Sequence, residues 1–232
     1  MRDSWRLAVG TLTAIRVAPP GRVDRSTARG AMLLAPLAVV PLGAVVGALL
    51  WAGGRTDVPP LAVALVALGV LAAGSRALHW DGLSDVADGL TASYDRERSL
   101  AVMKSGTAGP AGVVAVVVVL GVQAAALSSY VGSWRHALLA GVLVCLSRCA
   151  LWLVCAAPVP AARPDGLGVG FTSTVPLPLA VVGAVLLGVL PALLVVLLVV
   201  RCVRRFGGVT GDVMGASIEV ALAALLVGLS WL

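Results

Sequence analysis

Long apolar segments alternate with short polar stretches along nearly the whole chain. The apolar segments cover residues 31–52, 59–78, 111–131, 136–157 and 177–200, and a last one ends at Leu232. Most approach the length of about 20 residues that crosses a bilayer as an α-helix. Backbone polar groups in lipid must be hydrogen-bonded within their own segment, which favours helices. The pattern predicts an all-α integral membrane protein, a polytopic bundle of about six to seven transmembrane helices.

The composition agrees with a membrane protein. Hydrophobic residues make up 59% of the 232 residues and charged residues only 12%, whereas a soluble domain carries about 25% charged residues. The formal net charge of +6 comes mainly from arginines in residues 1–30 and in short loops. It lacks the clustered basic face of a nucleic-acid-binding protein. We therefore exclude nucleic acid as a partner and expect a lipid bilayer, with residues 1–30 at the cytoplasmic surface of the inner membrane.

The chain reads as one membrane-embedded catalytic domain over residues 1–232. Residues 1–30 carry too much charge for a cleavable signal peptide and are expected to lie at the membrane interface. The four cysteines fall in or beside apolar segments, where they act as small hydrophobic residues. They are Cys145, Cys149, Cys155 and Cys202.

An acidic stretch from His79 to Gly89 follows the second apolar segment. On a helix, Asp81, Asp85 and Asp88 stand at i, i+4 and i+7 and share one face. Three like charges on one face repel each other unless a cation binds them. Because Mg²⁺ prefers carboxylate oxygens, the spacing indicates a magnesium site.

Further polar residues lie beside or within other apolar segments. Lys104 precedes a loop with Gly109 and Gly112, which either binds phosphate through backbone N–H groups or is an ordinary glycine-rich loop before a span. Arg148 interrupts an apolar segment, which is rare unless the side chain faces a polar cavity.

A second acidic pair opens the last apolar segment. Asp212 and Glu219 are two helical turns apart, and Gly211 and Gly215 allow close helix packing between them. If their role is structural, Asp212 caps this helix and Glu219 pairs with Arg148. If their role is catalytic, the two sets of carboxylates, together with a lysine and a buried arginine, suit chemistry on a phosphorylated substrate.

The topology constrains residues 177–200. If this segment crosses the membrane once, Asp212 lies on the opposite side from Asp85, and Arg201 to Arg205 violate the positive-inside rule. A bent or re-entrant pair of half-helices over 177–200, permitted by its prolines and glycines, resolves the conflict. A dip of residues 82–105 into the membrane is the alternative.

These motifs resemble those of the cobalamin synthase family, adenosylcobinamide-GDP ribazoletransferase, over nearly the whole chain. The resemblance rests on five matches: His79-x-Asp81-Gly82-Leu83-x-Asp85-x-x-Asp88-Gly89, Gly109-x-x-Gly112, Ser147-Arg148, Gly166-Leu167-Gly168 and Gly207-Gly208-x-Thr210-Gly211-Asp212-x-x-Gly215-Ala216-x-x-Glu219.

The resemblance implies transfer of α-ribazole, or its 5′-phosphate, onto adenosylcobinamide-GDP, with Mg²⁺ as cofactor and GMP as the leaving group. Asp81, Asp85, Asp88 and Asp212 are then the metal ligands. Lys104 and Arg148 contact phosphate, and His79 or Glu219 is the general base; His79 alternatively supports a carboxylate. The predicted cofactor-binding residues are Gly82, Gly89, Gly109, Gly112, Gly207, Gly208, Thr210 and Gly211.

Two positions depart from the family pattern, and three alternatives stay open. Ser105 and Leu222 stand where the family usually has an acid, so the site holds fewer ligands or uses water there. The runner-up enzyme is a CDP-alcohol phosphotransferase, whose aspartate motif is matched only in part by Asp85-x-x-Asp88-Gly89. A cation- or proton-coupled transporter and a structural membrane subunit are the non-enzymatic alternatives. The sequence also allows a homo-oligomer.

Overall fold

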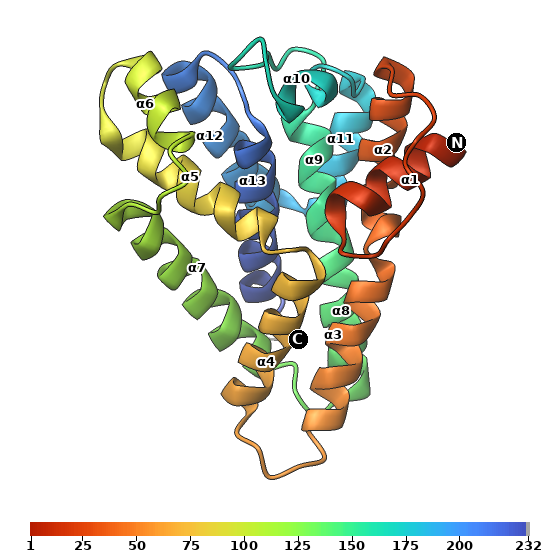
Figure 1. Ribbon diagram of the computed structural model, residues 1–232. Coiled ribbons are helices and arrows are strands. Elements are labelled where there is room, and N and C mark those ends of the chain that lie inside the picture. Colours follow the sequence, from red (N-terminus) through yellow and green to blue (C-terminus); the bar gives the residue numbers. More distant parts are fainter. Residues whose placement is uncertain (231–232) are drawn as a thin grey trace.

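The computed structural model describes residues 1–230, and within them it contains helices and two isolated β-bridges but no sheet (Figure 1). The prediction of an all-α protein is confirmed; the end of the last apolar segment at Leu232 lies outside the described residues. The helices are α1 (Arg2–Leu12), α2 (Arg25–Ala38), α3 (Val40–Gly53), α4 (Pro60–Gly74), α5 (Leu78–Ala92), α6 (Arg96–Met103), α7 (Pro110–Ser128), α8 (Trp134–Leu146), the 3₁₀ turn η1 (Ser147–Cys149), α9 (Ala150–Val154), α10 (Leu167–Phe171), α11 (Leu177–Leu187), α12 (Val189–Phe206) and α13 (Gly211–Gly228).

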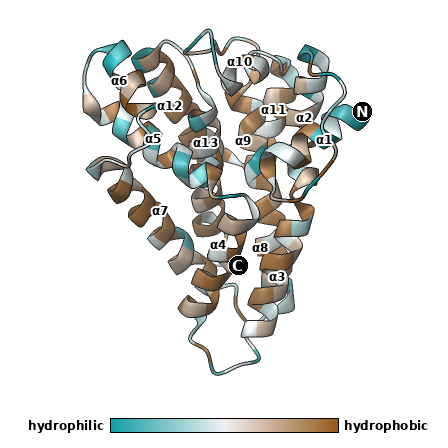
Figure 2. Ribbon diagram, viewed as in Figure 1, coloured by the Kyte–Doolittle hydropathy of each residue, from teal (hydrophilic) through white to brown (hydrophobic). Residues whose placement is uncertain are grey.

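Four helical stretches in the described part of the chain are long and apolar enough to cross a membrane, which confirms a multi-pass membrane protein. They are Arg25–Gly53, Pro110–Ser128, Trp134–Val154 and Gly211–Gly228. The number rises to five if α4 and α5, which meet at 92°, form one broken span. The predicted number of six to seven is not confirmed. Figure 2 shows the apolar helices α3, α7 and α8 below the more hydrophilic end that carries α6.

The turns between the spans show which ends of the helices lie together. At one end, the turn after α3 touches the turn after α7: the N–H of Gly132 donates to the carbonyl oxygen of Leu50 at 3.3 Å, and Gly54 faces Gly132. At the opposite end lie α6, α10 and the start of α13 (Figure 1). Both motif helices, α5 and α13, are therefore anchored at one end of the bundle.

Helices α11 and α12 form a re-entrant pair. Before α11, the N–H of Val175 bonds to the carbonyl of Cys155 at 3.0 Å; after α12, the carbonyl of Val209 accepts from the N–H of Ala162 at 3.0 Å. Both ends of the pair thus meet the loop that follows α9. Between the helices, Gly188 has φ 81°, a backbone conformation that glycine adopts without steric cost. Residues 177–200 enter and return to the same end, as the re-entrant alternative requires.

A sharp corner between α4 and α5 sets the direction of α5, the helix that carries the first acidic motif. Arg76 and Ala77 have φ 57° and 55°, the left-handed region that non-glycine residues seldom occupy. The guanidinium of Arg76 donates to the carbonyl of Gly10 at 2.8 Å, and the N–H of Ala14 donates to the carbonyl of Gly74 at 2.6 Å. The loop after α1 therefore holds a strained corner that turns α5 across α13.

Helices α5 and α13 cross with their backbones close together, and two glycines allow this. A Cβ added to Gly82 would lie 2.6 Å from the carbonyl oxygen of Asp212, and one added to Gly215 would lie 3.0 Å from the Cα of His79. Small residues allow helix backbones to approach closely in a membrane. The glycines of one motif thus pack directly against the polar residues of the other.

We expect Gly82→Ala to separate α5 from α13, because the new methyl group would overlap backbone atoms that have little room to move. Overpacking of this kind costs ~1–3 kcal/mol, and the displaced carboxylates would lower activity as well. Thermal unfolding in detergent and turnover in liposomes measure the two effects.

The matched control is Gly121→Ala on α7, where an added Cβ has no neighbour within 4 Å. It should keep wild-type stability and activity. Equal behaviour of the two variants would contradict the importance of the crossing.

Candidate active site

Carboxylates from both motifs face one another at the α5–α13 crossing. Asp81 and Asp85 come from α5 and Asp212 from the first turn of α13. The charge of Asp85 is repelled by Asp212, Asp81 and Asp88, and that of Asp212 is repelled by Asp81. The Asp212 carboxylate also accepts a hydrogen bond from the Thr210 hydroxyl at 3.0 Å. The structure therefore brings the two acidic motifs together, as the sequence predicted.

This acidic group is suited to a divalent cation but does not enclose one. Among the described residues, no three His, Cys, Asp or Glu side chains are grouped closely enough to hold a metal ion by themselves. Mg²⁺ commonly takes one or two carboxylates and completes its shell with water and substrate phosphates. One or two of Asp81, Asp85 and Asp212 would fit that pattern, and the repulsion among these carboxylates favours a bound cation.

Asp88, the fourth predicted metal ligand, is engaged elsewhere. Its two carboxylate oxygens accept hydrogen bonds from the N–H groups of Gly109, at 2.6 Å, and Gly112, at 2.8 Å. These N–H groups belong to the first turn of α7, whose unpaired donors favour a negative charge. Gly109 and Gly112, predicted to bind phosphate, thus bind the Asp88 carboxylate, and Asp88 fastens α7 to α5.

A polar pocket of about 160 Å³ opens beside the acidic group. Its lining includes Arg163, Asp165, Gly166, Gly168, Thr210 and Asp212. Thr210 is the N-cap of α13, so the positive end of this helix faces the pocket.

Arg163 is the functional candidate that the sequence prediction missed. Its Nη2 donates to the carbonyl of Leu100 at 2.7 Å, its buried Nε has no partner, and its charge attracts Asp85 and Asp212. Its position three residues before Gly166-Leu167-Gly168 was the available signal. A loop arginine without a known partner did not stand out in the sequence.

Lys104 does not line this pocket but is paired with Asp165, which does. Its Nζ is 3.1 Å from a carboxylate oxygen of Asp165, and both side chains are exposed. The ammonium holds the pKa of the Asp165 carboxyl below its usual range. This ion pair joins the loop after α6 to the loop before α10 and leaves Lys104 near the predicted phosphate region.

Most of the other glycines that were predicted to bind the cofactor pack against protein atoms instead. Gly89 packs against Met103 and Phe206, and Gly208 lies against the backbone of residues 160–162. Gly207 has φ 75° and ends α12 beside the Arg96 guanidinium. Gly211 differs from these, because it lines the polar pocket with Thr210.

A second cavity, about 160 Å³ in volume and mainly apolar, adjoins the polar pocket. Its apolar lining is Leu12, Met32, Leu78, Leu151, Phe171, Met214 and Ile218, and its polar lining includes His79 and Asp81. Residues Gly211 and Asp212 border both cavities.

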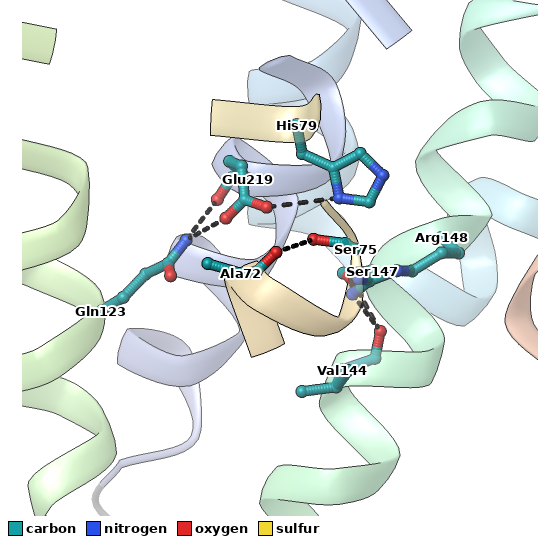
Figure 3. A network of polar contacts seen from close by, with 8 residues as sticks. All are labelled: Ala72, Ser75, His79, Gln123, Val144, Ser147, Arg148 and Glu219. Atoms are coloured by element: carbon teal, nitrogen blue, oxygen red, sulfur yellow. Dashed lines mark hydrogen bonds and ion pairs between the residues drawn. The ribbon is translucent and has the colours of Figure 1, made fainter. Parts of the chain in front are cut away.

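A buried polar cluster lies deeper in the bundle (Figure 3). One Glu219 carboxylate oxygen accepts from the Gln123 amide at 2.9 Å, and the other is 3.5 Å from Nδ1 of His79. Arg148 has no exposed surface; its Nη1 donates to the carbonyl of Val144 at 2.7 Å and to the Ser147 hydroxyl at 2.8 Å. The charges of Arg148 and Glu219 attract each other.

The buried cluster revises two predicted roles. Arg148 was predicted to contact phosphate, and Glu219 was a candidate base, yet neither lines the polar pocket or the apolar cavity. The structural alternative, in which Glu219 pairs with Arg148, is met only in part: their charges attract each other, but Nε and Nη2 of Arg148 have no hydrogen-bond partner among the described residues. His79 connects the cluster to the cavity, because it lies near Glu219 and also lines the cavity beside Asp81.

We expect Arg148→Met to destabilise the fold, because it removes the attraction between the buried charges of Arg148 and Glu219. Breaking a direct buried ion pair costs ~3–5 kcal/mol, and the loss here should be smaller because the attraction acts over a longer distance. The double variant Arg148→Met/Glu219→Gln should recover part of that loss, since no unpaired charge remains. Thermal unfolding in detergent measures both. An Arg148→Met protein of wild-type stability that has lost turnover would instead show a direct catalytic role.

Comparison with known proteins assigns the family. The family model for cobalamin-5-phosphate synthase matches residues 4–230. An adenosylcobinamide-GDP ribazoletransferase of Nocardioides sp. is 67% identical over 231 residues, covering 100% of this chain and 99% of that protein. Proteins of the same name from Frankia casuarinae and Pseudomonas paraeruginosa are 35% and 39% identical and cover 95% and 82% of this chain, with 92% and 83% of their own lengths aligned. No solved structure matches. The chain belongs to the cobalamin-5-phosphate synthase family.

Proposed function

We propose that this protein transfers α-ribazole, or its 5′-phosphate, onto adenosylcobinamide-GDP and releases GMP. The names of its relatives and the family match over residues 4–230 support this activity. The observation that carries it is the meeting of both acidic motifs beside a pocket that also holds Arg163 and the start of α13. The match favours this reaction over the CDP-alcohol phosphotransferase, transporter and structural-subunit alternatives.

The reaction exchanges one phosphoester bond for another. A ribose hydroxyl oxygen of α-ribazole bonds to the phosphorus attached to the corrinoid side chain. The bond from that phosphorus to the oxygen bridging to GMP breaks, and GMP leaves with the electron pair. Such a reaction depends mainly on alignment of the reacting groups and on stabilisation of phosphoryl charge.

The residues around the polar pocket have different roles in this reaction. Asp81, Asp85 and Asp212 would hold Mg²⁺, which supplies neutralisation of the phosphoryl oxygens. The Arg163 guanidinium and the N–H groups at the start of α13 face the same pocket and are suited to bind the diphosphate. Lys104 exchanges its Asp165 partner for a phosphate oxygen.

His79 is the proposed general base. Its Nδ1 lies 3.5 Å from Glu219, and the side chain lines the apolar cavity beside Asp81 and Asp212. A carboxylate at one ring nitrogen orients the imidazole so that the other nitrogen accepts the proton of the attacking hydroxyl. Glu219 is then a positioning residue.

The orientation in the membrane follows from charge. The end with α6, α10 and the acidic group also carries most of the arginines, whereas Arg55 and Arg135 lie with the turns at the other end. By the positive-inside rule we expect the arginine-rich end to face the cytoplasm, and we propose the inner membrane as the location of the protein.

The activity is tested by GMP release from purified protein in liposomes, with both substrates and with or without Mg²⁺. The wild type should release GMP only with the metal. Asp85→Asn and Asp212→Asn should each lose ~10²–10³-fold in turnover, the usual cost of removing a charge-stabilising group.

Asp57→Asn, in the turn at the opposite end, is the control and should be unaffected. Absence of GMP release by the folded wild type would overturn the proposed activity. Wild-type turnover in both aspartate variants would overturn only the metal site.

We expect His79→Gln to lower kcat by ~10²–10⁴-fold, the usual contribution of a general base, while KM for both substrates changes little. His136→Gln is the matched control, because His136 is the other histidine of the chain and belongs to α8 near the opposite end. A His79→Gln enzyme that changes KM but keeps kcat would show a binding role.

A further inference from the structure

Two cavities of different character meet at the start of α13. The polar pocket has Arg163 and the helix N-terminus on its walls, whereas the apolar cavity has side chains such as Leu12, Leu151 and Phe171. Gly211 and Asp212 form part of both walls. A single phosphate site explains the first cavity but gives no reason for the second.

We propose that the apolar cavity binds the aromatic base of the ribazole acceptor, while the polar pocket binds the diphosphate of the donor. This inference rests on the proposed transferase activity and adds where each substrate lies. Ribazole is a riboside of dimethylbenzimidazole, so its base is a flat, apolar ring system and its sugar is polar. The cavity has the same division: apolar side chains line most of it, and His79, Asp81 and Asp212 line the part next to the acidic group.

The size and lining of the cavity suit an aromatic ring. An apolar cavity of about 150 Å³ in another protein binds benzene, so this cavity of about 160 Å³ has room for one six-membered ring of the base. Phe171 offers a ring for aromatic contact, and Met32 and Met214 offer polarisable sulfur atoms that pack well against ring edges. Walls from α1, α2, α5, α9, α10 and α13 surround the ring from several sides.

The arrangement also orients the reaction. With the base in the apolar cavity, the ribose lies next to His79, Asp81 and Asp212, where a hydroxyl group can lose its proton to His79. The diphosphate in the polar pocket lies next to Gly211 and Asp212, which line both cavities. The attacking hydroxyl and the phosphorus therefore meet at the start of α13.

The cavity also provides a means of base selection. A tightly lined apolar site distinguishes substrates that differ by a methylene by about 10–200-fold. Leu151 and Leu12 line the cavity from α9 and α1. Enlarging either side chain should exclude the two methyl groups of the base before it excludes the bare ring.

The experiment measures KM for each substrate and base preference in liposomes. Leu151→Phe and, from a different helix, Leu12→Phe should raise KM for α-ribazole at least tenfold and leave KM for adenosylcobinamide-GDP unchanged. Both should shift the ratio of kcat/KM values toward unmethylated benzimidazole riboside by at least tenfold. Arg163→Ala should show the converse pattern, with KM raised for adenosylcobinamide-GDP alone.

Leu120→Phe on α7 lines neither cavity and is the matched control, with both KM values unchanged. Two phenylalanine variants that keep the wild-type base preference would overturn the inference, as would equal changes in KM for both substrates. Since the wild type must release GMP for these ratios to be measured, failure of the proposed function is seen separately. If one variant does not fold, the other still decides the outcome.

Discussion

The close crossing of α5 and α13 is the contact on which the rest of the structure depends. Gly82 and Gly215 remove the side chains that would keep the two backbones apart. The contact therefore brings Asp85 and Asp212, which are far apart in the sequence, into mutual repulsion. Packing energy elsewhere in the helix pair must offset that repulsion until a cation binds. Asp88 contributes by fastening α7 to the same helix through two backbone N–H groups.

The polar residues separate into two groups because membrane burial imposes different conditions on each. The group around Asp212 borders cavities, where water, a cation or a phosphate can compensate its charge. Arg148 and Glu219 are buried, so partners within the protein must compensate their charges. His79 belongs to both groups, which explains how a structural cluster can orient a residue at the reaction site.

The sequence predicted the membrane class, the meeting of the two acidic motifs and the re-entrant alternative for 177–200. Hydrophobic periodicity and the positive-inside rule are sufficient for these three predictions, because the predictions concern only the length of each segment and the side of the membrane on which it ends. They do not identify contact partners. The N–H groups of Gly109 and Gly112 suit a phosphate or a carboxylate equally well, and only the fold shows that Asp88 occupies them. Likewise, the sequence predicted that the intramembrane Arg148 contacts phosphate. The loop residue Arg163 fits this role better, because it lines the polar pocket and its Nε has no partner.

The re-entrant pair α11–α12 is the topological condition for such a site. A single crossing by this segment would start α13 at the opposite end from α5, and the glycine crossing could not form. By returning at Gly188, the chain brings the start of α13 back to the loop with Arg163, at the end where Asp81 and Asp85 lie. One glycine with a positive φ thus lets an apolar segment of spanning length return the acidic helix α13 to the loop that precedes the pair.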